Sequence, residues 1–294
     1  MRHDVTFLSE DRTLSGWLFR PESGGPCPLI VMAHGLTCVK EQYLDRYAGV
    51  FVAAGIGVLL YDHANFGASG GEPRQEVDPV LQRRGYRDAI TFAQTLHWVD
   101  AGRIGIWGTS FSGGHVLEVA AIDRRVKCVV SQVPTISGWQ SAQRRTRADL
   151  VPSVLARFEA DRAGRFRGEP PMMLPAVSAD PAMPCAMAGE DSYAFFTGTR
   201  EMAPNWRNEM TLRSAEMARE NEPGIYMARI SPTPLLMIVA RNDVLTATDL
   251  CLDAYERALE PKKLVMVPGG HFDPYVDQFA ITSGAARDWF RQHL

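Results

Sequence analysis

The sequence predicts an α/β fold: a mostly parallel, doubly wound sheet with an N-terminal antiparallel hairpin and an inserted, largely helical cap. Short continuous apolar runs, which are typical of strands buried on both faces, alternate with amphipathic helical patterns. Residues 5–20 instead alternate between apolar and polar positions, which indicates paired strands with one exposed face. The alternation of strands and helices stops between Gly138 and Ile230, so this part is predicted to interrupt the sheet.

The strands and helices follow one another in a regular order. The alternating segment turns at Glu10 and Asp11, which predicts a β-hairpin. Apolar runs predict six further strands at residues 28–34, 57–63, 103–108, 127–133, 234–240 and 262–269. Helices are predicted at Tyr43–Ala54, Arg84–Val99, Ser112–Ala121, Ala247–Leu259 and Val276–His293. Ligand sites in such sheets lie beyond the carboxyl ends of the strands, so the loops after these runs are the place to search.

The interrupted region divides the chain into a core, residues 1–138 and 231–294, and a cap, residues 139–230. Helices are predicted in the cap at 141–161 and 204–220. Eight of the 12 methionines lie in the cap, and together with aromatic residues they would give an adaptable apolar wall. The aromatic residues predicted to bind substrate are Trp139, Phe195, Phe196 and Trp206; the alternative is that such residues form the cap's own core.

Composition narrows the class of protein. The 294 residues are 46% apolar and 22% charged, with a formal net charge of −3, so neither nucleic acid nor a membrane surface is expected as a partner. The N-terminus does not resemble a signal peptide, and no apolar run approaches the ~20 residues that span a bilayer. The scattered cysteines form no C-x-x-C pair, which favours a reducing, cytoplasmic location. They are Cys27, Cys38, Cys128, Cys185 and Cys251.

A serine lies at the junction between the run 103–108 and the helical pattern that follows it. The stretch from Gly108 to Ser112 reads GTSFS, which matches the nucleophile elbow G-x-S-x-G except that Ser112 replaces the last glycine. A strained strand-to-helix turn requires small residues at these positions. The free N–H groups at the start of the helix favour a developing oxyanion. We therefore predict Ser110 as the nucleophile and the backbone N–H of Phe111 as one oxyanion donor.

The partners of this serine are expected at the ends of other strands. The loop HGLT follows an earlier strand, and the N–H of Leu36 is predicted as the second oxyanion donor, with Thr37 as the alternative. Asp243 lies three residues beyond the run that ends at Ala240, and His271 follows the last run. Serine, acid and histidine therefore occur in the chain order of the nucleophile-elbow hydrolases.

Other candidate residues fit less well. His97 and His115 lie within helical patterns, whereas His63 lies beside Asp62 at the end of a strand and is predicted to line the substrate pocket. No cysteine occupies the nucleophile position, and no aspartate does either, which argues against epoxide hydrolase or haloalkane dehalogenase chemistry. The sequence contains no P-loop, no convincing dinucleotide fingerprint and no metal-ligand spacing, so no cofactor and no metal are expected.

Several motifs together resemble the α/β-hydrolase superfamily over essentially the whole chain. They are HGLT, YDHANFGASGGEP, GIWGTSFSGG, VARNDVLT and GGHF. They are similar to the branch that includes X-Pro dipeptidyl-peptidase-like hydrolases, dienelactone-hydrolase-like proteins and the hydrolases or polyketide transferases of secondary metabolism. The resemblance implies that residues 64–73 border the entrance of the active site. Many members are dimers, so a homodimer is compatible with it.

The leading interpretation is a serine hydrolase that cleaves a small-molecule ester, thioester or lactone through an acyl-enzyme on Ser110. If the cap excludes water and admits another acceptor, the same residues give an acyltransferase. An aminopeptidase-like activity would need an acidic group in the cap. Glu190, Asp191 and Glu209 are the candidates, although a solvated face is the more common role for such residues. A binding protein on this fold often lacks one of the three residues, whereas this chain has all of them.

The region Arg144–Arg167 is locally basic. It contains seven arginines against Asp149, Glu159 and Asp161. Such a region attracts an acidic substrate, for example an acyl-CoA, or it forms only a solvated helix face. The sequence leaves both alternatives open, and solvation is the more common one.

Overall fold

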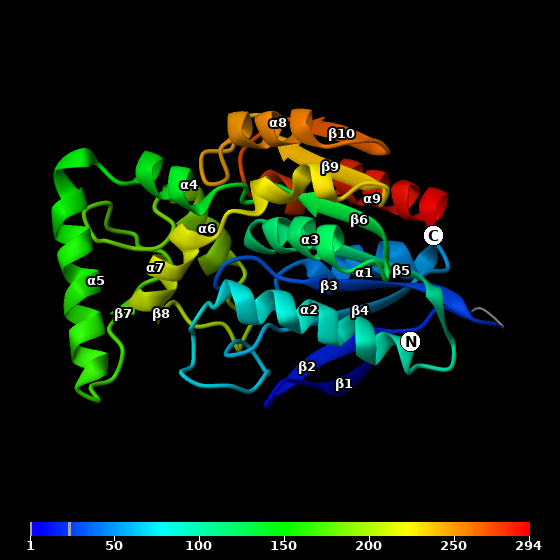
Figure 1. Ribbon diagram of the computed structural model, residues 1–294, viewed down its shortest axis with the longest axis horizontal. Coiled ribbons are helices and arrows are strands. Elements are labelled where there is room, and N and C mark those ends of the chain that lie inside the picture. Colours follow the sequence, from blue (N-terminus) through cyan, green and yellow to red (C-terminus); the bar gives the residue numbers. More distant parts are fainter. Residues whose placement is uncertain (1, 23–24) are drawn as a thin grey trace.

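A single eight-stranded sheet forms the centre of the computed structural model, which describes residues 2–22 and 25–294 (Figure 1). The strand order is β1-β2-β4-β3-β5-β6-β9-β10. Strands β4, β3, β5, β6, β9 and β10 run parallel, and β1 and β2 extend one edge in antiparallel pairing. The bounds are β1 Arg2–Ser9, β2 Arg12–Phe19, β3 Cys27–Ala33, β4 Gly57–Tyr61, β5 Val99–Thr109, β6 Val126–Gln132, β9 Leu235–Ala240 and β10 Lys262–Val267. The predicted hairpin and all six predicted parallel strands are confirmed.

Helices cover both faces of the sheet, as expected for a doubly wound fold. Helices α1 (Leu44–Ala53) and α9 (Phe279–His293) pack on one face, where Tyr47 and Phe290 are fully buried. Helices α2 (Pro79–Gln94), α3 (Phe111–Ile122) and α8 (Thr248–Arg257) contribute to the core on the other face. The two layers leave the carboxyl ends of the parallel strands facing the inserted region (Figure 1).

Helix α2 begins and ends five residues earlier than the prediction of Arg84–Val99. Asp78 caps it by accepting hydrogen bonds from the N–H groups of Val80 and Leu81, and Pro79 occupies the first turn. An aspartate followed by proline is a helix-start signal that the apolar periodicity did not reveal.

The inserted region differs more from its prediction. The helix predicted at 141–161 is two helices, α4 (Gly138–Arg145) and α5 (Val151–Phe166), separated by a short 3₁₀ turn. The helix predicted at 204–220 begins only at α7 (Leu212–Glu220), because Thr211 caps it by accepting from the N–H of Ser214. Helix α6 (Glu190–Gly198) and the short pair β7 (Met173–Leu174) and β8 (Met210–Thr211) were not predicted.

The end of the inserted region packs with the core. A 3₁₀ segment, η2 (Pro223–Arg229), lies against α3, and Met227 and Ile230 are buried in the same cluster as Val116. The boundary at residue 231 is therefore not visible as a break in packing. Figure 1 shows α4, α5 and α7 beyond the end of the sheet, with α5 outermost. Across residues 2–22 and 25–294, no helix combines the length and the hydropathy needed to cross a membrane.

Candidate active site

The turn between β5 and α3 holds Ser110 in a strained conformation. Its φ is 57° and its ψ is −118°, a region that residues with a Cβ rarely occupy. The N–H of Ser110 donates to the carbonyl of Gln132 at 2.8 Å, and its own carbonyl accepts from the N–H of Thr135 at 3.0 Å. These bonds come from the segment at the end of β6. The neighbouring strand therefore stabilises a backbone conformation that the local sequence alone would not favour.

Gly108 makes this turn sterically possible. A Cβ at this position would lie 2.2 Å from the carbonyl oxygen of Ser112, a backbone atom that cannot move without opening the turn. We expect Gly108→Ala to lower the free energy of unfolding by about 2–3 kcal/mol, measured by urea denaturation. Gly49→Ala is the matched control, because Gly49 is exposed in α1 with open space around it. That control is expected to be neutral or stabilising by up to about 1 kcal/mol; equal losses in both variants would contradict this role of Gly108.

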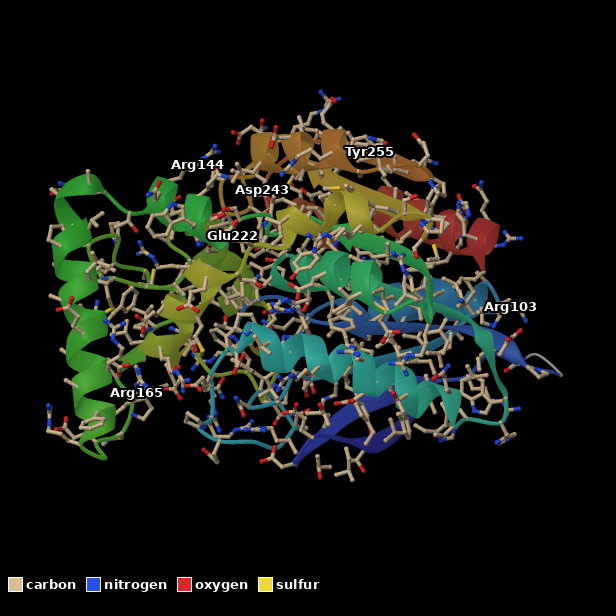
Figure 2. The ribbon with its side chains drawn as sticks, viewed as in Figure 1. Arg103, Arg144, Arg165, Glu222, Asp243 and Tyr255 are labelled. Atoms are coloured by element: carbon tan, nitrogen blue, oxygen red, sulfur yellow. The ribbon has the colours of Figure 1, made fainter. Side chains whose placement is uncertain are left out.

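Three of the predicted residues meet at the end of the sheet. His271 Nε2 lies 2.9 Å from Ser110 Oγ, and His271 Nδ1 lies 2.7 Å from Asp243 Oδ2. All three side chains are buried. Asp243 follows β9 and His271 follows β10, so the parallel order of the strands brings together residues that are far apart in the chain. Figure 2 shows Asp243 at the end of the sheet that faces the inserted region.

The loop after β9 holds the carboxylate of Asp243 in place. Oδ1 accepts from the N–H groups of Leu245 and Thr246 at 2.8 and 2.9 Å, and Oδ2 accepts from the hydroxyl of Thr246 at 2.8 Å. Burial acts to raise the pKa of Asp243, but the interactions with His271 and Thr246 outweigh it, so the pKa lies below the ordinary value. Thr246 was not predicted; the only sequence signal is an aspartate followed three residues later by threonine, typical of local side-chain capping.

The loop after β3 lies directly against the serine. A Cβ on Gly35 would come 3.0 Å from the Cβ of Ser110. The carbonyl of Gly35 accepts from His34 Nδ1 at 2.9 Å and from the N–H of Cys38 at 3.2 Å. Because the two ends of a trans peptide point in opposite directions, this fixes the orientation of the next N–H, that of Leu36. Leu36 and Phe111 both line the cavity that contains Ser110, whereas Thr37 does not.

His63 does not line this cavity, contrary to the prediction. It is buried behind the elbow, where its Nε2 lies 2.7 Å from the hydroxyl of Ser112 and its backbone N–H donates to His34 Nε2 at 3.0 Å. Burial, and then the nearby His34 and His115, lower the pKa of His63 well below the ordinary value, so the ring is neutral. Ser112 in turn donates to the carbonyl of His34 at 2.5 Å. The serine that replaces the last glycine of the motif thus joins the elbow to the loop that contains Leu36.

The four predicted aromatic residues also lie outside the cavity wall. Phe196 stacks on Trp206 at 5.2 Å between ring centroids, and Phe195 stacks on Phe272 at 4.4 Å. They belong to an apolar cluster that also contains Val39 and Leu245, so they join the inserted region to the sheet core and form the cap's own core only in part. Trp139 is 52% exposed on α4. Aromatic side chains pack against whichever apolar surface lies nearest. The sequence pattern did not reveal whether that surface is the cavity wall or a neighbouring apolar cluster.

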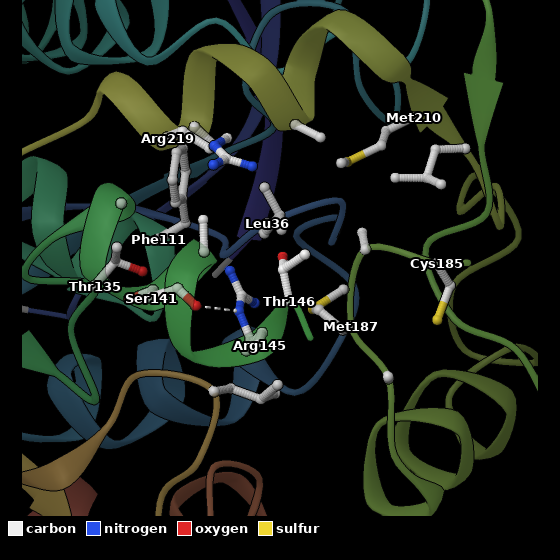
Figure 3. Close-up of a pocket in the computed structure, with 18 of the residues that line it drawn as sticks. Leu36, Phe111, Thr135, Ser141, Arg145, Thr146, Cys185, Met187, Met210 and Arg219 are labelled. Carbon is white, nitrogen blue, oxygen red and sulfur yellow. Dashed lines mark hydrogen bonds between the residues drawn. The ribbon is translucent and has the colours of Figure 1, made fainter. Parts of the chain in front are cut away.

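The cavity itself has a volume of about 420 Å³ and contains Ser110 and His271. Helices α4, α5 and α7 and the loop 184–188 supply its outer wall. Figure 3 shows Arg145 of α4, Arg219 of α7 and Cys185 and Met187 of the loop around this space. The apolar part of the lining includes Phe158, Leu174, Met187, Met210 and Leu212. Glu190, Asp191 and Glu209 are exposed and do not line it. Within the described residues, no cluster of three histidine, cysteine or acidic side chains could hold a metal ion.

A mostly parallel sheet with N-terminal antiparallel strands is the architecture of the α/β hydrolases, and the chain is an enzyme of this type. The model of the X-Pro dipeptidyl-peptidase (S15) family matches residues 13–273, and the chain belongs to this family. The resemblance stated from the motifs is thereby confirmed.

The similar proteins carry several different names. A thiohydrolase of Eupenicillium brefeldianum is 34% identical over 92% of this chain and 88% of its own length. The quorum-quenching protein AidA of Acinetobacter baumannii is 32% identical over 94% and 89%. The polyketide transferase grgF of a Penicillium species is 30% identical over 100% and 97%. The crystal structure of GrgF superposes with a TM-score of 0.86 at 30% identity, covering 100% of this chain and 99% of that chain.

Proposed function

We propose that the chain is a serine hydrolase that cleaves a carboxylic ester, thioester or lactone through an acyl-enzyme on Ser110. The observation that carries the proposal is the continuous hydrogen-bonded path from Ser110 Oγ through His271 to Asp243, with separations of 2.9 and 2.7 Å, opening on a cavity. An isolated serine hydroxyl is a weak nucleophile, and this arrangement supplies the base that activates it.

In the proposed mechanism, Ser110 Oγ attacks the substrate carbonyl while His271 Nε2 takes the hydroxyl proton. Asp243 holds the ring with Nδ1 protonated and stabilises the imidazolium. The N–H groups of Phe111 and Leu36 bind the oxyanion, and each such donor is typically worth ~10²–10³ in rate. His271 then protonates the leaving alcohol or thiol, and a water activated by the same ring releases the acyl group from Ser110.

An acyltransferase is the second candidate. Ser110 is only 9% exposed and the cavity around it is lined largely by apolar side chains, so an acyl-enzyme there would have restricted contact with water. In this proposal residues 139–230 act as a cap, and an alcohol or amine takes the acyl group in place of water. The relatives named thiohydrolase and polyketide transferase support both reactions on this fold.

An X-Pro peptidase activity has less support. A site that binds a substrate ammonium group needs a carboxylate within reach. The only carboxylate in hydrogen-bond contact with the Ser110–His271 pair is Asp243, among the described residues, and it is already engaged by His271 and Thr246. The candidates Glu190, Asp191 and Glu209 lie outside the cavity wall.

A fluorophosphonate probe tests the proposal directly. We expect the native protein to be labelled stoichiometrically, with the modified peptide containing Ser110. Hydrolysis of p-nitrophenyl esters from acetyl to decanoyl then separates the two candidates. Steady turnover supports the hydrolase, whereas one equivalent of p-nitrophenol followed by a stall supports the transferase. A protein that is neither labelled nor acylated would contradict both.

A further inference from the structure

The cavity next to Ser110 is lined by arginines and by no acidic side chain. Arg144, Arg145, Arg157 and Arg219 all contribute to its wall, which contains neither aspartate nor glutamate among the described residues. Arg144 is paired with Asp249 through two hydrogen bonds of 2.7 and 2.8 Å. The other three have no carboxylate within ion-pair distance in the described part of the chain. The wall therefore carries a positive charge that the protein itself does not neutralise.

Arg145 lies at the end of α4, and its Nε donates to the carbonyl of Ser141 at 3.2 Å. Burial by the surrounding protein lowers the pKa of Arg145, and the charge of Asp243 partly opposes this effect. The side chain is nevertheless exposed to the cavity, whose wall it helps to form. Its one hydrogen bond to the described residues uses Nε, so the terminal N–H groups of the guanidinium remain available to bind an anion.

Arg219 approaches from α7. Its guanidinium lies 5.5 Å from the ring centroid of Trp139 and 5.8 Å from that of Phe158. Contacts with aromatic faces orient a guanidinium and leave its charge and its N–H donors available. Figure 3 shows Arg145 and Arg219, from two different helices, reaching toward the space around Leu36. Both arginines therefore face the volume that an acyl group on Ser110 would occupy.

Most arginines of the basic region Arg144–Arg167 form ion pairs and do not contribute unpaired charge to the cavity. Five of its seven arginines are paired with carboxylates: Arg144 with Asp249, Arg147 with Asp149, Arg162 with Glu216, Arg165 with Asp161, and Arg167 with Glu169. Figure 2 shows Arg144 and Arg165 on different sides of the inserted region. The two arginines left over, Arg145 and Arg157, are those that line the cavity without a carboxylate. The solvated interpretation thus holds for most of this region and fails at the cavity.

We propose that the substrate carries an anionic group, carboxylate or phosphate, which Arg145 and Arg219 bind while Ser110 attacks the carbonyl. This inference rests on the proposed function. Guanidinium groups bind either anion through charge-assisted, often bidentate hydrogen bonds. The apolar lining between the arginines and Ser110 accommodates the hydrocarbon part. The anion lies either on the acyl chain, as in a dicarboxylic monoester, or on the leaving group, as in a coenzyme A thioester.

Two matched substrate pairs distinguish these sources. The first is mono-p-nitrophenyl glutarate against p-nitrophenyl pentanoate, which have the same chain length and differ in a terminal carboxylate. The second is S-pentanoyl-4′-phosphopantetheine against S-pentanoyl-pantetheine, which differ only in the phosphate of the leaving group. We expect kcat/KM for the anionic member of one pair to exceed that of its neutral partner by about 10-fold or more. The pair that shows the preference identifies which part of the substrate bears the anion.

Arginine variants assign the preference to these side chains. In Arg145→Gln/Arg219→Gln, kcat/KM for the anionic substrate is expected to fall by about 10- to 100-fold, and that for the neutral substrate by less than about 3-fold. Arg147→Gln is the matched control, because Arg147 is exposed and paired with Asp149 outside the cavity. It is expected to behave as the native protein. No preference in the native protein, or equal losses on both substrates in the double variant, would overturn the inference.

Binding measured without turnover separates this inference from the proposed function. Calorimetry with Ser110→Ala and the four substrates is expected to show tighter binding of the anionic member, lost when Arg145→Gln and Arg219→Gln are added. If Ser110→Ala binds the anionic substrate through these arginines but the native protein shows neither turnover nor labelling, only the proposed function is contradicted. Equal kcat/KM for the neutral and anionic members of both pairs would contradict this inference alone.

Discussion

Replacing Ser110 by alanine is expected to abolish fluorophosphonate labelling and to lower kcat for any ester substrate by about 10⁶-fold. The loss should be this large because Ser110 Oγ is the only hydroxyl, among the described residues, in hydrogen-bond contact with His271 Nε2. The hydroxyl of Ser112 is held between His63 and the carbonyl of His34, behind the elbow. The backbone of the turn has no need of the Ser110 side chain, since its hydrogen bonds to Gln132 and Thr135 use main-chain atoms. Ester turnover and labelling stoichiometry measure the effect.

Ser153→Ala is the matched control for this variant. Ser153 is an exposed serine on α5 that lies outside the cavity wall, so both labelling and turnover should stay at native levels. Thermal unfolding of Ser110→Ala should occur within a few degrees of the native protein. If a folded Ser110→Ala protein kept more than about a hundredth of the native turnover, another residue would be the nucleophile.

Asp243→Asn is expected to lower kcat by about 10⁴-fold with little change in KM. One carboxylate oxygen of Asp243 accepts two backbone N–H groups, and the other accepts from His271 Nδ1 and the hydroxyl of Thr246. An asparagine amide nitrogen cannot accept a hydrogen bond, yet each of the two oxygen positions of Asp243 is surrounded by hydrogen-bond donors. With the backbone N–H groups bound to its oxygen, it would donate to Nδ1 of His271. The ring would then carry its proton on Nε2 and could not take one from Ser110.

The control for this variant is Asp253→Asn, which alters an exposed carboxylate on α8, in the same part of the chain. The kcat of Asp253→Asn is expected to stay within about twofold of the native value. If Asp243→Asn also kept a kcat within about twofold of the native value, the proposed mechanism would be contradicted. Because the pKa of Asp243 is lowered in the folded protein, its hydrogen-bonded carboxylate contributes stability above the unfolded pKa of about 3.9. That contribution should be lost as the pH falls through the folded pKa, and it should be missing in the asparagine variant.

Sequence reasoning located Ser110, Asp243 and His271 because each follows a strongly apolar strand. The carboxyl ends of neighbouring parallel strands meet at one edge, so strand-end positions far apart in sequence are necessarily close in space. The same reasoning placed His63 in the pocket, since it too follows a strand. In the structure β4 lies next to β2 and β3, and His63, two residues beyond its end, turns behind the elbow toward Ser112. Position at a strand end brings a residue to the edge, but it does not decide the direction of the side chain.

The inserted region was the least predictable part. Its methionines suggested an apolar wall, and Met187 and Met210 do line the cavity. Phe195, Phe196 and Trp206 instead pack against one another and Phe272. Neither local periodicity nor composition distinguishes an aromatic residue that faces a ligand from one that faces its neighbours, because both are enclosed by apolar surface.

By itself, the sequence determined the order of strands and helices in the sheet core, the elbow and the chain order of the three candidate catalytic residues. These features follow from local periodicity and from turn residues, which act within a few positions. Only the tertiary structure decided which charges remain unpaired. Arg144 and Arg145 are adjacent in sequence, yet one meets Asp249 on α8 and the other lines the cavity without a carboxylate. Electrostatic pairing depends on distances between distant segments, and these exist only once the chain has folded.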